Sequence, residues 1–158
     1  MDPCYYLFTD QITYGWTCMI KSILVADDDL DFRLIIRLAL EASGYKGNMH
    51  FVDDGLELMD YLNHRGEYLD SEIPDLIILD LNMPRKNGRE ALHEIKADPA
   101  LTSIPIVILS VASSKEDLQL SRDFDCPFIR KPDSYSQWVN AMEALLKFYG
   151  TEDVKGDP

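Results

Sequence analysis

The sequence predicts an α/β fold, a doubly wound parallel sheet with helices on both faces. Short apolar segments rich in β-branched residues alternate with amphipathic segments five times along the chain. This alternation is typical of βα units joined by right-handed crossovers. Two segments, 77–79 and 104–109, are continuous apolar runs, as expected for strands buried on both faces of a parallel sheet.

The first two units are marked by periodicity and by end signals. Strands are expected at 22–26 and 48–52, and helices at 29–43 and 56–62. Asp29 or Asp31 is suited to cap the first helix, and Gly44 is suited to end it. The apolar residues expected on the inner faces of these helices are Phe32, Ile35, Ile36, Leu38, Ala39 and Leu40, followed by Leu56, Met59 and Leu62.

The last three units follow the same pattern. Strands are expected at 77–79, 104–109 and 128–130, and helices at 90–97, from Ser113 onward, and at 134–149. The helix at 90–97 must stop before Pro99, because the residue before a proline avoids the α region. Ser113 and Glu116 form a capping box. The last helix carries Trp138, Met142, Leu145 and Tyr149 on one stripe and ends at Gly150.

The composition excludes several classes of protein. With 158 residues, 15 basic and 28 acidic side chains, the chain carries a formal charge of −13, which disfavours binding to nucleic acids and anionic membranes. No apolar run reaches the roughly 18 residues of a membrane helix, and the acidic N-terminus is a poor signal peptide. Three cysteines (4, 18, 126) and three histidines (50, 64, 93) form neither a disulfide framework nor a metal pattern, so we expect a cytoplasmic protein.

The chain length fits one domain with a short addition at each end. Residues 1–18 are aromatic and unperiodic, and form an extension of unknown role; Met19, directly before the first strand, is a candidate translation start. The domain is expected at 19–150, and 151–158 is expected to be a disordered tail.

Polar side chains gather where the predicted strands end. Asp27 and Asp28 follow the first strand, Asp80 the third, Ser110 the fourth and Lys131 the fifth. In an open α/β sheet, ligands bind beyond these carboxyl ends. Three adjacent carboxylates repel one another unless a cation is present, and Mg²⁺ prefers such oxygen ligands. Each residue also has a plain structural explanation, as a helix cap, a turn residue or a solvated lysine.

Taken together, these residue types describe an aspartate that accepts a phosphoryl group. Asp80 would be the nucleophile, and Lys131 and Ser110 would bind the phosphoryl oxygens beside the cation. Two enzyme or cofactor classes are alternatives. A phosphatase of the haloacid dehalogenase type needs a second aspartate two residues on, where this chain has Asn82. A flavodoxin-like carrier needs a phosphate-binding loop after the first strand, where three acids stand instead.

Four motifs resemble the receiver domain of two-component response regulators. They are ILVADD at 23–28, LIILDLNMPRKNG at 76–88, IPIVILS at 104–110 and FIRKP at 128–132, and the similarity spans 21–149. The resemblance implies a flavodoxin-like (CheY-like) fold with a parallel five-stranded sheet of order 2-1-3-4-5. The segment from Arg65 to Pro99 further resembles phytochrome-associated stand-alone regulators, including a long connection at 63–74.

The resemblance also implies a role for each matching residue. Asp80 matches the phosphoacceptor, and Asp27 and Asp28 match the acidic pair that binds Mg²⁺. The implied roles of the remaining positions are metal binding by the backbone carbonyl of Asn82, phosphoryl binding by Ser110 and Lys131, and an aromatic switch at Phe128. Phe128 is also explained as a plain core aromatic.

The resemblance therefore implies a single-domain regulator rather than an enzyme, since it would catalyse only its own phosphorylation and dephosphorylation. The phosphodonor would be a sensor histidine kinase of the phytochrome type, and the output would be a protein contact of unknown identity. A homodimer through the fourth helix, fifth strand and fifth helix is expected. The alternative is a degenerate receiver that only docks to a partner.

Overall fold

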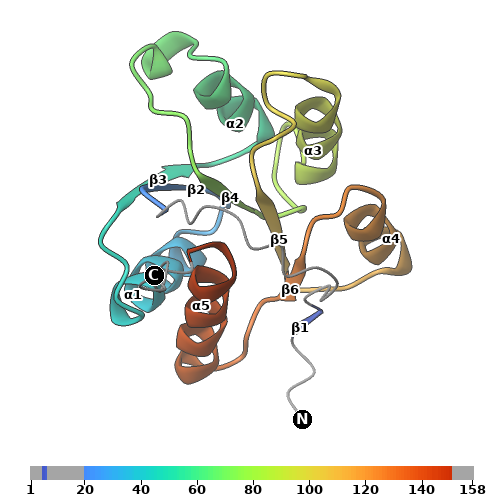
Figure 1. Ribbon diagram of the computed structural model, residues 1–158. Helices are drawn as coiled ribbons and strands as arrows, with labels where there is room; N and C mark the ends of the chain where they lie inside the picture. Colours follow the sequence, from blue (N-terminus) through green and yellow to red (C-terminus); the bar gives the residue numbers. More distant parts are fainter. Residues whose placement is uncertain (1–4, 7–19, 151–158) are drawn as a thin grey trace, which may run out of the picture.

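A twisted sheet lies at the centre of the molecule, and helices cover both of its faces (Figure 1). The computed structural model describes residues 5–6 and 20–150. The strands are β1 (Tyr5–Tyr6), β2 (Ser22–Ala26), β3 (Asn48–Val52), β4 (Leu76–Leu79), β5 (Ile106–Ser110) and β6 (Phe128–Arg130). The helices are α1 (Leu30–Ala42), α2 (Gly55–Leu62), the 3-10 helix η1 (Gly66–Tyr68), α3 (Gly88–Ala97), α4 (Lys115–Asp123) and α5 (Tyr135–Tyr149). None of the helices in these ranges is long and apolar enough to span a bilayer.

Five of the strands run parallel in the order β3-β2-β4-β5-β6. Counted from β2, this is the predicted order 2-1-3-4-5, which is confirmed. The chain winds outward from β2 to β3 and then returns across β2 to β4. The order therefore reverses between β2 and β4, and such a reversal is where open α/β sheets bind their ligands.

The sheet separates two apolar cores. On one face, α1 and α5 pack through Ile36, Trp138 and Met142 among others; on the other, α2 and α3 pack through residues such as Leu58 and Leu92. Alternate residues of each strand serve opposite faces, because side chains along a strand have a period of two. Every residue of β2, β4 and β5 is buried, as their continuous apolar runs predict.

The start of α4 differs from the prediction. Ser114, not Ser113, is the N-cap: its backbone is extended, and its Oγ accepts a hydrogen bond from the backbone N–H of Asp117 at 3.0 Å. Both serines have an acid three residues later, so the capping pattern has two registers one residue apart. The prediction selected the wrong one.

The inner face of α1 is narrower than its apolar residues predict. Ile36, Ala39 and Leu40 are buried, whereas Leu38 is exposed. Leu38 joins Leu30 and Leu34 on an outer stripe, since residues four apart lie on one side of a helix. Leu56 of α2 is likewise exposed.

A short strand from the N-terminal extension adds to the edge of the sheet. β1 pairs antiparallel with β6, with Tyr5 opposite Ile129 and Tyr6 opposite Phe128. No strand is expected there from the sequence. The rest of the extension and the tail at 151–158 lie outside the described residues, so the division at 19 and 150 stays a prediction.

The long connection from α2 to β4 returns beside β3 at the opposite edge. Glu72 accepts a hydrogen bond from Asn48 Nδ2 at 2.9 Å and lies 2.8 Å from His50 Nε2. These bonds lower the pKa of the Glu72 carboxyl. They attach the predicted long connection to the side chains of β3.

Gly88, the first residue of α3, lies directly against the backbone that follows β4. A Cβ at this position would meet the carbonyl oxygen of Asp80 and would lie 2.7 Å from Leu81 Cα. The backbone N–H of Gly88 also donates to Leu81 O at 3.0 Å. The absence of a side chain therefore allows α3 to approach Asp80 closely.

Replacing Gly88 by Ala is expected to destabilise the protein by about 3 kcal/mol, because the new methyl group meets backbone atoms that cannot move aside. Urea unfolding measures the loss. Gly66→Ala is the control: its φ of 59° is unfavourable for alanine, but a Cβ there meets nothing within 4 Å, so it should lose only about 1 kcal/mol. An equal or smaller loss for Gly88→Ala would contradict the close approach.

Candidate functional site

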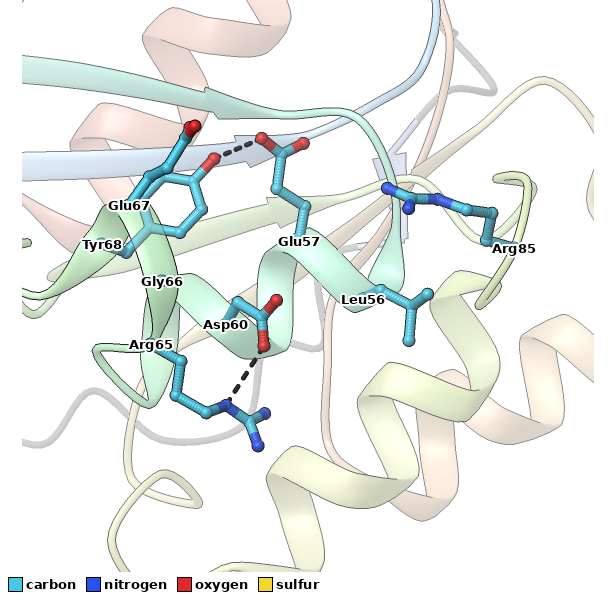
Figure 2. Close-up of a pocket in the computed structure, with 8 residues that line it drawn as sticks. All are labelled: Leu56, Glu57, Asp60, Arg65, Gly66, Glu67, Tyr68 and Arg85. Carbon is cyan, nitrogen blue, oxygen red and sulfur yellow. Dashed lines mark hydrogen bonds and ion pairs between the residues drawn. The ribbon is translucent and has the colours of Figure 1, made fainter.

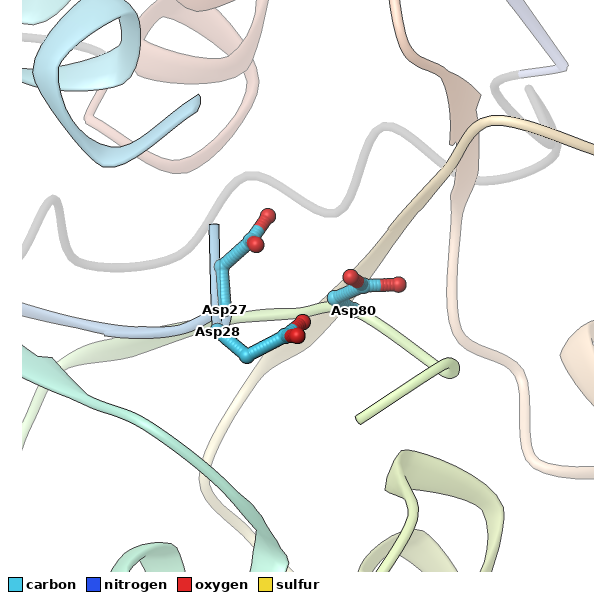
Figure 3. Close-up of side chains that lie close together, drawn as sticks. All are labelled: Asp27, Asp28 and Asp80. Carbon is cyan, nitrogen blue, oxygen red and sulfur yellow. The ribbon is translucent and has the colours of Figure 1, made fainter. Parts of the chain in front are cut away.

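Three carboxylates meet where β2 and β4 end, at the point where the strand order reverses. Asp27 and Asp28 directly follow β2, and Asp80 directly follows β4. One oxygen from each side chain lies within 4.8 Å of the others (Figure 3). Asp27 and Asp80 are buried, whereas Asp28 is exposed. The sheet thus assembles the predicted acidic cluster and leaves one side of it open to solvent.

Lys131 is a buried cation beside this cluster. Its Nζ lies 2.8 Å from Asp27 Oδ2 and 3.3 Å from Asp80 Oδ2. Its third neighbour is the ring of Phe32 on α1, whose centroid is 3.9 Å from Nζ. An aromatic face attracts a cation, so Phe32 helps to hold the ammonium group against the two carboxylates.

The environment of Asp80 disfavours its charged form. Burial raises the pKa of this carboxyl above its ordinary value, and the nearby charge of Asp27 adds to the effect. The backbone N–H of Asn82, which donates to Asp80 Oδ1 at 3.0 Å, and the ammonium group of Lys131 act in the opposite direction. Burial has the largest influence, as it does for most carboxyls removed from water.

Ser110 ends β5, the strand next to β4. Its Oγ is buried and has no hydrogen-bond partner among the described residues. The backbone N–H of Lys131 donates to Ser110 O at 2.8 Å, which aligns the ends of β5 and β6. A buried hydroxyl without a partner is costly, and it can donate to an oxygen that enters the site.

Phe128 is a core side chain in this structure. It lies on β6, is 2 % exposed, and packs in the same core as Ile108 and Cys126. This position agrees with its explanation as a core aromatic. Its role as a switch stays a prediction.

Two arginines that are not among the predicted site residues bond to residues just beyond the carboxyl ends of β2 and β3. Arg33 Nε donates to Asp27 O at 2.5 Å. Arg85 Nε donates to the buried carboxylate of Asp54 at 2.5 Å, although Arg85 has a positive φ of 61°. These contacts join distant elements, so no local sequence pattern signals them.

The residues present suit a hard divalent cation. Three carboxylates of like charge converge, and oxygen ligands of this kind bind Mg²⁺ together with waters and phosphate oxygens. The raised pKa of Asp80 is consistent with this, since a bound cation would stabilise the charged form that burial disfavours.

A separate hollow lies between α2 and η1 (Figure 2). Its volume is about 410 Å³, and its lining includes Glu57, Asp60, Arg65 and Tyr68. Arg65 pairs with Asp60, and the hydroxyl of Tyr68 donates to Glu57. Four of the polar groups that line the hollow are therefore already paired with one another.

The fold and the site together define the class of signalling proteins built on a doubly wound sheet with an acidic cluster at the switch point. The chain belongs to the response regulator receiver domain family, whose model matches residues 23–143. This confirms the resemblance carried by the four motifs.

The similar proteins include two response regulators, Rcp1 and RcpA. The response regulator Rcp1 of Synechocystis is 42% identical over 96 residues, which cover 61% of this chain and 65% of that protein, just under two thirds of its length. The crystal structure of the phosphorylated cyanobacterial phytochrome response regulator RcpA has a TM-score of 0.77 and 38% identity, covering 84% of this chain and 95% of that one. A Mn²⁺-bound structure of Rcp1 has a TM-score of 0.76 at 32% identity, covering 83% and 95%.

Replacing Asp80 by Asn is expected to stabilise the protein by about 1–2 kcal/mol at pH 7 without divalent cations, since it removes a buried charge. A pKa raised on folding makes the wild type lose stability as the pH rises from the unfolded value of about 4 through the folded value. The gain should therefore vanish below about pH 4. Urea unfolding at several pH values measures it.

The control for this experiment is Asp123→Asn, which removes an exposed acid on α4 and should leave stability nearly unchanged. Equal stability of wild type and Asp80→Asn at pH 7 would show that burial does not penalise the Asp80 charge.

Proposed function

We propose that this protein is a cytoplasmic single-domain response regulator that accepts a phosphoryl group from the phosphohistidine of a sensor histidine kinase. The acceptor is Asp80, and the reaction depends on Mg²⁺. The observation that carries the proposal is the arrangement around Asp80: two further carboxylates, the ammonium group of Lys131 and the free hydroxyl of Ser110.

The reaction is a transfer between two side chains. A carboxylate oxygen of Asp80 attacks the phosphorus, the P–N bond to the imidazole breaks, and the leaving imidazole takes a proton from solvent. The product is an acyl phosphate. Such transfers depend mainly on positioning and on charge neutralisation. Lys131, buried beside Asp80, neutralises phosphoryl oxygens, and Ser110 Oγ donates a hydrogen bond to one of them.

Asp27, Asp28 and Asp80 would hold the magnesium ion, with the backbone carbonyl of Asn82 as a further ligand. When bound, Mg²⁺ supplies positive charge that neutralises phosphoryl oxygens. The Mn²⁺-bound structure of Rcp1 supports a divalent cation in this family. The bond from Asn82 N–H to Asp80 Oδ1 fixes the backbone next to the proposed carbonyl ligand.

A phytochrome-type histidine kinase is the proposed phosphodonor. The support is the likeness to RcpA, which is a phytochrome response regulator, and to Rcp1. The output is proposed to be a change in a surface that contacts another protein, because the formal net charge of −13 disfavours binding to nucleic acid.

We also propose a homodimer through the face formed by α4, β6 and α5. β1 pairs with the outer edge of β6, so a second molecule cannot pair with that edge of β6 while β1 is in place. The two copies would therefore meet through the surfaces of α4 and α5, unless β1 leaves.

Incubation with acetyl phosphate and Mg²⁺ is expected to add one phosphoryl group to the protein, because Asp80 lies beside Lys131 and two further acids that could hold the cation. Intact-mass spectrometry measures the addition. Asp80→Asn and removal of the metal with a chelator should each abolish it.

Asp70→Asn, which changes an exposed acid before β4, is the matched control and should be labelled like the wild type. Continued labelling of Asp80→Asn would refute the acceptor assignment. Failure of the wild type with both acetyl phosphate and phosphoramidate would favour the degenerate, docking-only alternative.

Phosphorylation is expected to shift the protein from monomer toward dimer in size-exclusion chromatography with light scattering. A form beginning at Met19, which lacks β1, should dimerise at least as readily, because the edge of β6 is then uncovered. Monomers under all of these conditions at high protein concentration would refute the dimer.

A further inference from the structure

Arg89, on the first turn of α3, contacts both the loop after Asp80 and helix α4. Its Nη1 donates to Leu81 O at 3.3 Å and to Asn82 Oδ1 at 3.2 Å. Its Nε and Nη2 donate to the two carboxylate oxygens of Asp117 at 2.7 and 2.8 Å. One guanidinium group therefore joins the acceptor loop to α4.

The bond to Asp117 is the strong end of this connection. Asp117 is only 3 % exposed, and a buried carboxylate needs a partner that compensates its charge. A bidentate arginine provides one with fixed geometry. The hydrogen bonds from Arg89 to Leu81 and Asn82 are longer and therefore weaker. A change in the loop after Asp80 would alter them before it alters the ion pair with Asp117.

Helix α4 has no fully buried apolar side chain. Its fully buried residues are Asp117 and Ser121, and both are polar; Leu118 and Leu120 are only partly buried. Ser121 Oγ donates to Cys126 O at 2.5 Å. An element with few buried apolar side chains has low local stability. The loss of one ion pair can therefore shift the position of α4 or make its local unfolding more frequent.

The acceptor and Arg89 share the same loop. Asn82 N–H donates to Asp80 Oδ1, while the Asn82 side chain accepts from Arg89. Asn82 thus contacts the acceptor through its backbone and Arg89 through its amide. An adjustment of Asn82 on phosphorylation of Asp80 would therefore act directly on a bond to the guanidinium group.

We propose that Arg89 is a positioning residue that couples the state of Asp80 to α4 through Asn82 and Asp117. This inference rests on the proposed function. Because such coupling is reciprocal, a partner that binds α4 also changes the lifetime of the phosphoryl group on Asp80.

The test compares wild type with Arg89→Gln. Amide hydrogen exchange of residues 115–123 is measured before and after phosphorylation with acetyl phosphate, and intact mass reports the phosphorylated fraction. In the wild type, phosphorylation should change exchange in α4. In Arg89→Gln, Asp80 should still be phosphorylated, but the change in α4 should be lost, and the half-life of the phosphoryl group should change by about fivefold or more.

Two further variants separate coupling from simple loss of stability. Arg89→Gln leaves the carboxylate of Asp117 buried and unpaired, so the double variant with Asp117→Asn should recover stability without recovering the response of α4. Arg122→Gln is the matched control, since Arg122 lies on α4 and its side chain bonds only to exposed Gln119 among the described residues; it should keep the full response.

A response of α4 that persists in the phosphorylated Arg89→Gln protein would overturn the coupling, as would an unchanged α4 in phosphorylated wild type. Both results leave phosphorylation of Asp80 intact. Absence of phosphorylation in the wild type would instead overturn the proposed function, and the coupling with it.

Discussion

The repulsion among Asp27, Asp28 and Asp80 is the constraint on which the site depends. The strand order places the ends of β2 and β4 side by side, so their terminal acids meet. Two like charges about 4 Å apart repel by about 4 kcal/mol at an effective dielectric constant near 20, a large part of the 5–15 kcal/mol that stabilises a typical domain. Lys131 offsets part of this repulsion, and the rest makes the cluster receptive to a cation.

The sequence predicted most of the fold and the reactive end of the sheet. The runs at β2, β4 and β5 are buried on both faces, and such runs are hard to mistake for a surface helix. Once these strands are parallel, their ends must share one edge. Asp27, Asp80 and Ser110 were therefore predicted to lie together from chain order alone, and the described geometry of the acids agrees.

The residues that hold the site could not be predicted in the same way. Phe32 looks like any core residue of α1, yet its ring faces Lys131. Arg89 and Asp117 lie on different helices, and their pairing depends on how α3 and α4 pack. Side-chain pairs across elements have no period along the chain. The predicted start of α4 was wrong for a different reason: Ser113 and Ser114 are each followed by an acid three residues later, so the capping pattern fits both.

The two outer strands of the sheet have a consequence for how copies of this protein can associate. Unpaired backbone groups on an edge strand invite another chain to add to the sheet, which leads to aggregation. Here the backbone of β6 pairs with β1. At the other edge, Glu72 contacts the side chains of Asn48 and His50 on β3. Pairing of a second molecule with β6 is therefore opposed by β1. The strand at this edge, β1, has only two residues, and so short a strand offers little backbone on which another molecule could extend the sheet.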